Sequence, residues 1–312
     1  MDSTDPTEPA PTDPTAPTNP VGPVSATPTG PTDPSHSWVQ QATDNGVSWI
    51  TLNRPEAMNA ITPDQRERII SLLDAASADP AVRAVVITAV GKGFCAGADL
   101  RGASAPAPAP APASAPASSP ATDERVAGDV ARTIRRGAQR LISAVLDCEK
   151  PVIAAVNGTA AGLGAHLALA CDLVLAAESA RFIEVFVRRG LVPDGGGAYL
   201  LPRLVGPQRA KELMFFGDAL GAADAARMGL VNRVVADAEL GATAKEWAER
   251  LAAGPTRALA LTKHLVNASL DADRSSAFAA ESWAQEINMT TRDANEGVAG
   301  FVARRTPKYR GL

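Results

Sequence analysis

One stretch constrains the fold of this chain more than any other: residues 150–172, KPVIAAVNGTAAGLGAHLALACD. Its first part, Pro151 to Val156, is an apolar run rich in β-branched residues, and Asn157-Gly158 is a turn pair. Gly162-Leu163-Gly164 then opens an apolar segment, 165–170, whose composition and spacing favour a helix. The pattern predicts a strand, a glycine turn and a helix. Because the first N–H groups of a helix lack intrahelical partners, such a turn can hold an anion or a developing oxyanion. Glycines at such turns also serve simply to pack backbone against backbone.

Two proline-rich tracts interrupt the rest of the chain. Residues 1–36 form a Thr/Pro/Asp tract with almost no large apolar side chain, and residues 103–122 alternate Ala with Pro. Neither tract can bury enough apolar surface to offset the entropy of ordering it. We therefore expect a disordered tail and a solvated, extended insert, and a remainder long enough for one sizeable domain with helical extensions.

Charge and cysteine content exclude several classes of function. The net charge is −4 and the basic residues are scattered, so no nucleic-acid partner is expected. There is neither a signal-peptide pattern nor an apolar run of the roughly 20 residues that a membrane helix needs, which indicates a cytoplasmic protein without a membrane partner. The spacing of the cysteines and histidines predicts neither a disulfide framework nor a metal site: Cys95, Cys148, Cys171, His36, His166 and His264.

Strand and helix patterns alternate up to residue 235. Thr62, Pro63 and Gln65 make a capping box at the start of one helix, and Gly-rich loops follow three of the strand patterns. Strands are expected at 38–53 as a hairpin turning at 44–46, and at 82–89, 151–156, 173–176, 182–185 and 230–235. Helices are expected at 63–79, 129–148, 207–216, 222–228, 237–253, 255–270 and 274–303. The sequence thus predicts an α/β core, 37–235, of stacked parallel sheets, followed by an all-helical region, 236–312.

Five motifs occur in order along the chain: LNRPEAMNA, GFCAGADL, the stretch 150–172 quoted above, RGLVPDGGGAYLLPRLVG and GVAGFVARRTPKYRG. In this order they resemble the crotonase superfamily of enoyl-CoA hydratases and isomerases, over about residues 38–312. The resemblance implies a crotonase-like ββα superhelix, a spiral of stacked parallel sheets, with a C-terminal α-helical trimerisation region and hence a homotrimer or dimer of trimers. It also implies an acyl-CoA thioester substrate, with no cofactor because coenzyme A is part of that substrate. The Ala/Pro insert falls where the family has a variable loop beside the acyl pocket.

The resemblance also implies positions for the binding groups. The family holds the thioester oxygen with two backbone N–H groups, which here belong to Ala98 and Leu163. Such donors stabilise an oxyanion by about 2.7–4 kcal/mol each. The adenine and pantetheine of coenzyme A lie, in the resemblance, against Asn59-Ala60 and against the segment 96–100. The substrate-binding residues implied are Asn59, Ala60, Ala96, Asp99 and Leu100.

The proton chemistry departs from that of the family's hydratases. Those enzymes place two glutamates where this chain has His166 and Phe186, and Glu184 lies two residues from the second position. His166 suits a general acid or base, although a histidine among Leu and Ala is often a hydrogen-bonded filler. Glu184 is either a displaced catalytic carboxylate or a solvated or salt-bridged strand residue. Asp194 stands where double-bond isomerases and members with a nucleophilic aspartate carry a carboxylate, although it could instead cap the following helix.

Asp194 and His166 are therefore the candidate catalytic residues. A single base can remove a proton from one carbon and return it two carbons away, so the favoured function is isomerisation of an enoyl-CoA with Asp194 as base. Three alternatives stay open. They are hydration of 2-enoyl-CoA by His166 with Asp194 or Glu184, thioester hydrolysis with Asp194 as nucleophile, and acyl-CoA binding without catalysis. The length and branching of the acyl group are not determined by the sequence.

Overall fold

A computed structural model describes residues 37–102 and 127–312 of the chain. The predictions for the tail, 1–36, and for the insert, 103–122, lie outside the described residues. Within the described ranges, no helix is long and apolar enough to cross a membrane.

Ten strands form two sheets. The larger sheet has the order β1-β2-β3-β5-β7-β10, and the smaller one has the order β4-β6-β8-β9. All neighbouring strands are parallel except β1 with β2 and β8 with β9. The strands of the larger sheet are β1 (Val39–Asp44), β2 (Val47–Leu52), β3 (Ala84–Ala89), β5 (Val152–Val156), β7 (Leu173–Ala177) and β10 (Arg233–Val235). Those of the smaller sheet are β4 (Gly93–Cys95), β6 (Thr159–Ala161), β8 (Arg181–Ile183) and β9 (Ala219–Gly221).

The connectivity repeats. Three times the chain runs from a strand of the larger sheet directly into a strand of the smaller one: β3 to β4, β5 to β6, and β7 to β8. Each pair is followed by one or more helices, so the chain advances as a spiral of ββα units. This architecture confirms the expected α/β fold with stacked, mainly parallel sheets.

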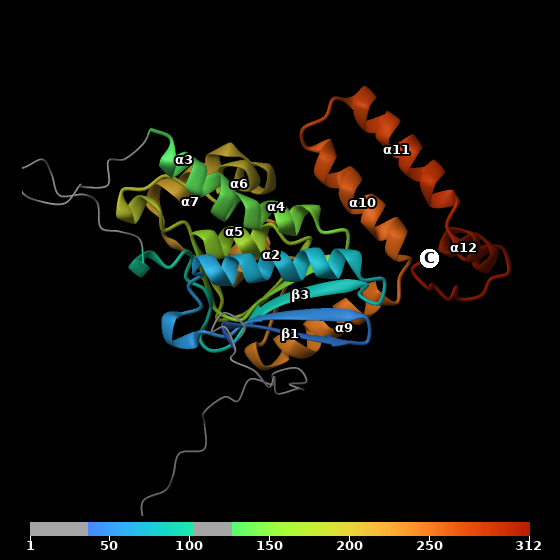
Figure 1. Ribbon diagram of the computed structural model, residues 1–312, viewed down its shortest axis with the longest axis horizontal. Helices are drawn as coiled ribbons and strands as arrows, with labels where there is room; N and C mark the ends of the chain where they lie inside the picture. Colours follow the sequence, from blue (N-terminus) through green and yellow to red (C-terminus); the bar gives the residue numbers. More distant parts are fainter. Residues whose placement is uncertain (1–36, 103–126) are drawn as a thin grey trace, which may run out of the picture.

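Helices cover both faces of the larger sheet. In Figure 1, α2 lies above this sheet and α9 lies on its opposite side. The helices are α2 (Pro63–Ala78), α3 (Asp129–Ile134), α4 (Arg140–Asp147), α5 (Leu163–Leu169), α6 (Gly197–Val205), α7 (Pro207–Phe216), α8 (Ala222–Arg227), α9 (Leu240–Ala252), α10 (Thr256–Ser269), α11 (Arg274–Met289) and α12 (Arg292–Val302).

Local signals in the sequence account for several element ends. Asn45 and Gly46 both have positive φ, which suits the tight turn between β1 and β2. At the start of α2, the N–H of Gln65 donates to the Thr62 hydroxyl, and the Gln65 side chain accepts from the Thr62 N–H. This is the predicted capping box.

The structure corrects three helix predictions. The expected helix 129–148 contains a π-helical segment, η3 (Arg135–Gln139), between α3 and α4. The expected helix 274–303 is two helices, because the Thr291 hydroxyl accepts from the Ala294 N–H and starts α12 anew. The prediction also missed α6, whose interior Pro202 is an unfavourable helix signal.

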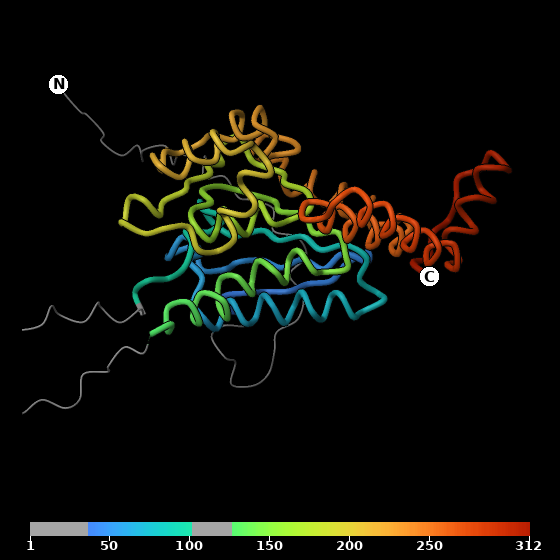
Figure 2. The backbone as a smooth tube through the Cα atoms, turned by 90° about the horizontal axis from the view of Figure 1, so that it is seen from above, coloured from blue at the N-terminus to red at the C-terminus, as the bar shows by residue number. Residues whose placement is uncertain are grey.

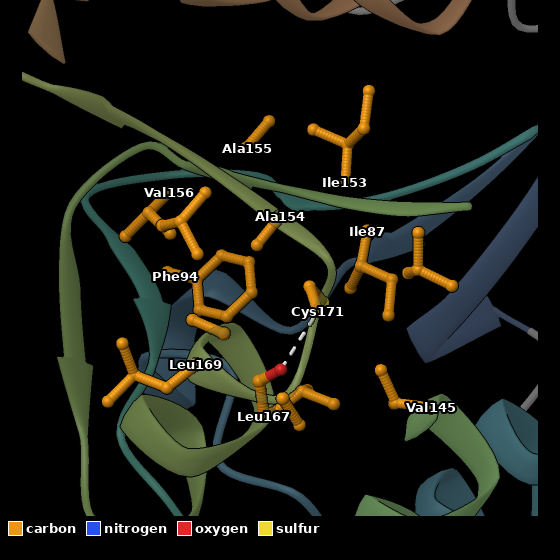
Figure 3. Packing of buried hydrophobic residues seen from close by; sticks show 14 of the residues in the cluster. Ile87, Phe94, Val145, Ile153, Ala154, Ala155, Val156, Leu167, Leu169 and Cys171 are labelled. Carbon is orange, nitrogen blue, oxygen red and sulfur yellow. Dashed lines mark hydrogen bonds between the residues drawn. The ribbon is translucent and has the colours of Figure 1, made fainter. Parts of the chain in front are cut away.

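The core lies between the sheets and α5. Figure 3 shows Phe94 of β4 beside Ala154 and Val156 of β5, with Leu167 of α5 on the other side, whereas Ile153 points to the opposite face of β5. Cys171 donates from its thiol to the Leu167 carbonyl at 3.3 Å, and all three cysteines are unpaired. The stretch 150–172 therefore runs through the centre of the molecule.

The last three helices form an arm, α10–α12, that extends away from the sheets (Figure 2). Lys263 of α10 holds it to the core, since its ammonium group contacts Asp172 Oδ2 at 2.9 Å and the Val145 carbonyl at 2.9 Å. Large apolar side chains remain exposed on α11 and α12: Phe278, Trp283, Ile287, Val298, Phe301 and Val302.

Candidate active site

Two glycine-rich loops pack backbone against backbone at the start of α5. A Cβ on Gly164 would overlap the carbonyl oxygen of Cys95, so no larger residue fits there without movement of the chain. A Cβ on Gly97 would lie 2.9 Å from the Ala161 carbonyl oxygen and 3.5 Å from the Leu163 nitrogen. The loop after β4 therefore lies directly beside the first residue of α5.

This contact brings two unpaired N–H groups close together. The first hydrogen bond of α5 runs from the His166 N–H to the Gly162 carbonyl, so the Leu163 N–H has no partner among the described residues. The Ile61 N–H donates to the Gly97 carbonyl, and the Asp99 N–H donates to the Ile61 carbonyl. The N–H of Ala98, which lies between Gly97 and Asp99, therefore also has no described partner. The structure thus places both predicted oxyanion donors in adjacent segments.

The backbone at Leu163 tolerates its side chain. The positive φ of this turn, 52°, belongs to Gly162, and Leu163 is not among the residues with positive φ. Since only glycine adopts such a conformation readily, Gly162 is required for the turn and Leu163 is not strained.

His166 is fully buried and paired with Glu184. Its Nε2 lies 3.0 Å from Oε2 of Glu184, and the two side chains are 1% and 6% exposed. The ring stacks on Phe186, with ring centroids 5.3 Å apart and planes inclined by 13°. Glu184 is thus not a solvated strand residue: it is buried and in direct contact with His166.

The third glycine-rich loop closes over His166. A Cβ on Gly197 would overlap Nε2 of His166, and a Cβ on Gly195 would lie 3.3 Å from its Nδ1 and 2.7 Å from Cδ1 of Leu163. The glycines of PDGGG therefore make room for the histidine ring and for Leu163. The same contacts bring the loop that carries Asp194 to the start of α5.

Asp194 is half-buried at the beginning of this loop. Burial raises the pKa of Asp194 above its usual range, against the opposing effects of the nearby His166 and of the backbone N–H groups of Asp194 and Gly195. No side chain in the described ranges forms an ion pair or hydrogen bond with this carboxylate. The pKa of Asp194 is thus closer to neutral pH than that of an exposed aspartate.

Asn59 has an internal role in the structure. It is 1% exposed, has positive φ, and donates from its amide group to the carbonyls of Val90 and Gly93 at 2.9 and 2.8 Å. Its side-chain oxygen accepts from the Arg54 N–H at 2.7 Å. The side chain of Asn59 therefore fixes the loop and has no polar group left for a ligand, and its neighbour Ala60 is also buried.

Asp99 is likewise engaged by the protein. Its carboxylate, 8% exposed, contacts Arg54 at 2.7 Å and Arg101 at 2.9 and 2.8 Å, and the Arg101 hydrogen bonds hold the pKa of Asp99 well below its usual range. Of the other residues predicted to bind the substrate, Ala96 is partly exposed and Leu100 is 53% exposed. The backbone and Leu100, rather than the Asp99 carboxylate, are what this loop offers to a ligand.

Three groups near the site were not assigned a role from the sequence. Arg54 joins the two loops, since it donates to the Ala60 carbonyl as well as to Asp99. Ala138 and Ile142 come from the η3–α4 helix, and they lie next to Gly195 and Gly196 respectively. The sequence predicted the helix, but no local signal shows which of its residues faces the glycine loop.

No group of three or more His, Cys, Asp or Glu side chains in 37–102 and 127–312 is arranged to hold a metal ion. The site residues described above are two backbone donors, a buried His–Glu pair and one carboxylate.

Comparison with known proteins matches this arrangement to one family. Residues 42–311 match the family model described as enoyl-CoA hydratase/isomerase. The chain is 36% identical to the 1,2-epoxyphenylacetyl-CoA isomerase of Escherichia coli, over 86% of this chain and 96% of that protein. It is also 36% identical to the crotonyl-CoA hydratase of Syntrophomonas wolfei, over 83% and 92% of the two chains.

A solved structure shows the same fold. The enoyl-CoA hydratase from Bacillus anthracis superposes with a TM-score of 0.77 at 31% identity, and covers 88% of this chain and 100% of its own. The similarity thus extends over both sheets and the helices, well beyond the three glycine-rich loops.

Proposed function

The chain belongs to the enoyl-CoA hydratase/isomerase family, and on that premise we propose that it moves a double bond along the acyl chain of an enoyl-CoA. In this proposal the thioester oxygen is bound by the N–H groups of Ala98 and Leu163, and Asp194 is the base. Coenzyme A is part of the substrate, so the proposed reaction needs no separate cofactor.

The two N–H groups supply the electrostatic part of the reaction. Removing a proton from the acyl chain of a thioester places negative charge on the thioester oxygen. Donors already aimed at that oxygen stabilise this charge by about 2.7–4 kcal/mol each. Their lack of partners among the described residues and the direct packing of their two segments support this role.

The observation that carries the proposal is that Asp194 has no side-chain partner in the described residues, whereas Glu184 is committed to His166. One carboxylate is enough for isomerisation, because it can take a proton from one carbon and return it to another. Hydration by the family's two-glutamate arrangement would need a second carboxylate, and Phe186 stands in that position. The relatives do not decide between the reactions, since an isomerase and a hydratase are equally similar.

We also propose that the protein is a trimer or a dimer of trimers, joined through the α10–α12 arm. Phe301 is 85% exposed and Trp283 is 70% exposed on this arm. Exposed apolar side chains that gather on one element commonly mark an interaction surface. Analytical ultracentrifugation would test this part of the proposal, and a monomer would contradict it.

Isomerisation is tested with purified protein and a 3-enoyl-CoA. The wild type should equilibrate it with the 2-enoyl-CoA, and Asp194→Asn should lower the rate by roughly 10²–10⁴ because the base is lost. Binding of a saturated acyl-CoA should remain, which separates loss of the base from loss of the site. Asp218→Asn, at an exposed carboxylate paired with Arg188, is the matched control and should leave the rate unchanged.

Hydration of 2-enoyl-CoA is the second candidate, because His166 and Glu184 form a buried acid–base pair next to Asp194. Hydration of crotonyl-CoA that persists in Asp194→Asn and disappears in His166→Ala would contradict the isomerase proposal. Release of free coenzyme A would instead indicate a hydrolase, and binding without turnover of any enoyl-CoA would indicate a non-catalytic protein.

A further inference from the structure

The His166–Glu184 pair has an unusual feature on the side of the ring that faces away from Glu184. Nδ1 of His166 is buried and has no hydrogen-bond partner in the described residues. Buried polar atoms are normally satisfied, and leaving one without a partner costs about 1–3 kcal/mol. An unpaired ring nitrogen beside a candidate acyl site is therefore a group that a ligand can satisfy.

The surroundings of the pair determine which form this nitrogen takes. Beyond His166, Glu184 faces a cavity of about 10 Å³ that is otherwise lined by apolar side chains, among them Leu169, Leu201 and Leu213. The only salt bridge of Glu184 in the described part of the chain is the one with His166. An apolar surrounding disfavours any net charge on the pair.

Two arrangements of the shared proton leave the pair neutral without an unpaired hydrogen on Glu184. In one, an ionised Glu184 accepts from a doubly protonated His166. In the other, a protonated Glu184 donates to Nε2 of a neutral imidazole, whose own hydrogen must then lie on Nδ1. Both of these arrangements therefore place a hydrogen on Nδ1. A bare Nδ1 requires one of two less favourable arrangements. An ionised Glu184 with a neutral His166 leaves a net negative charge near that of Asp194, and a protonated Glu184 that accepts from Nε2 leaves its own O–H beside apolar side chains without an acceptor.

Nδ1 faces Gly195, in the loop beside Leu163 and Asp194, and it has no accessible surface in this structure, so an acyl oxygen reaches it only when this loop shifts. The position of a Cβ on Gly195 is 3.3 Å from Nδ1, 2.7 Å from Cδ1 of Leu163 and 3.6 Å from Cβ of Ala138. Gly195 directly follows Asp194 in the chain. A hydrogen on Nδ1 thus points toward Leu163 and the loop of Asp194, the two parts of the proposed site that contact the acyl group.

We propose that Glu184 is a positioning residue that keeps a hydrogen on Nδ1 of His166, and that this N–H binds an oxygen atom on the acyl chain of the substrate. The preferred substrates are then acyl-CoA thioesters that carry an oxygen function, such as an oxo group, close to the thioester. This inference rests on the proposed acyl-CoA site, and it assigns His166 the part of a donor rather than of a base.

Binding of two saturated thioesters of equal chain length tests the donor. Acetoacetyl-CoA carries a carbonyl oxygen on its third acyl carbon, whereas butyryl-CoA carries none, and neither has a carbon–carbon double bond to isomerise or hydrate. Isothermal titration calorimetry should show acetoacetyl-CoA binding to the wild type at least about tenfold more tightly. In His166→Leu/Glu184→Met, which removes both partners and leaves no buried charge, the two affinities should become nearly equal.

The position of the hydrogen can be observed directly. The chain has only three histidines, so ¹⁵N-histidine labelling gives few imidazole signals, and those missing from the double variant belong to His166. At pH 7 the wild type should show a protonated Nδ1, and Glu184→Met should lose that signature as the other tautomer becomes populated. Glu149→Gln, at an exposed carboxylate paired with Arg257, should change neither the spectrum nor the affinity ratio.

Three results would overturn the inference: equal affinities in the wild type, a preference for acetoacetyl-CoA that survives in the double variant, or an Nδ1 without hydrogen in the wild type. Failure of the proposed isomerisation is distinguishable, because it would abolish turnover of 3-enoyl-CoA while leaving the affinity ratio and the spectrum as stated here.

Discussion

The two halves of the candidate site are built from different parts of the chain. The proposed oxyanion half consists of the N–H groups of Ala98 and Leu163, and the residues that shape it are glycines whose missing side chains allow backbone contact. The proposed proton-transfer half consists of the side chains of His166, Glu184 and Asp194. Hence the first half requires that side chains be absent at its glycines, whereas the chemistry of the second half depends on which side chains are present.

This difference explains why the family and the reaction are not equally evident. The glycine contacts require the same small residues in any protein that holds a thioester oxygen in this way, so they produce motifs. The family resemblance implies different proton-transferring side chains for hydratases and isomerases, and one relative with each name is 36% identical to this chain.

The largest expected effect tests whether the oxyanion half depends on backbone contact. Gly164→Ala places a methyl group into the Cys95 carbonyl oxygen, and neither backbone can move aside cheaply. We expect the free energy of unfolding to fall by about 3 kcal/mol or more, with loss of turnover, as measured by urea denaturation and a 3-enoyl-CoA assay.

Gly221→Ala is the matched control, because φ there is −69° and no heavy atom lies within 4 Å of the added Cβ. It should change the free energy of unfolding by less than about 1 kcal/mol, because the lower unfolded-state entropy of alanine opposes its weaker preference for the N-cap position of α8. Equal stability of the two variants would show that the backbone contact is not as tight as described.

A smaller effect separates backbone from side chain within one residue. Ala98→Pro removes the N–H but leaves the neighbouring bonds to Ile61, which come from Gly97 and Asp99. Turnover should fall by roughly 10²–10³, whereas Ala98→Ser, with an exposed side chain and an intact N–H, should stay within about twofold. Unfolding midpoints of both variants check that the loop is retained. Similar rates for both variants would remove Ala98 from the oxyanion site.

The smallest effect concerns the proton-transfer half. Because burial raises the pKa of Asp194, this carboxylate holds its proton to a higher pH than an exposed aspartate does. A base must be ionised, so kcat/KM should decrease as the pH falls through a pKa above the usual aspartate range. The measurement is a pH–rate profile with 3-enoyl-CoA, with unfolding followed at each pH. An acid limb at or below the usual range would contradict Asp194 as the base.

Much of the fold follows from local patterns. The capping box at Thr62, the turn at Asn45-Gly46 and the strand–glycine–helix pattern of 150–172 each depend on residues a few positions apart, and each is present in the structure. Elements with weak or misleading local signals were missed. A helix with an internal proline, α6, is one, and the π-helical segment within 129–148 is another.

The site shows the same division. The sequence by itself determined the family, the glycine-rich loops and the identity of the residues at the expected catalytic positions, because motifs record local backbone requirements. Only the tertiary structure decided that Asn59 and Asp99 are consumed by internal hydrogen bonds, and that Glu184 pairs with His166 while Asp194 has no side-chain partner in the described residues. These facts depend on distances between side chains far apart in sequence, and packing sets such distances.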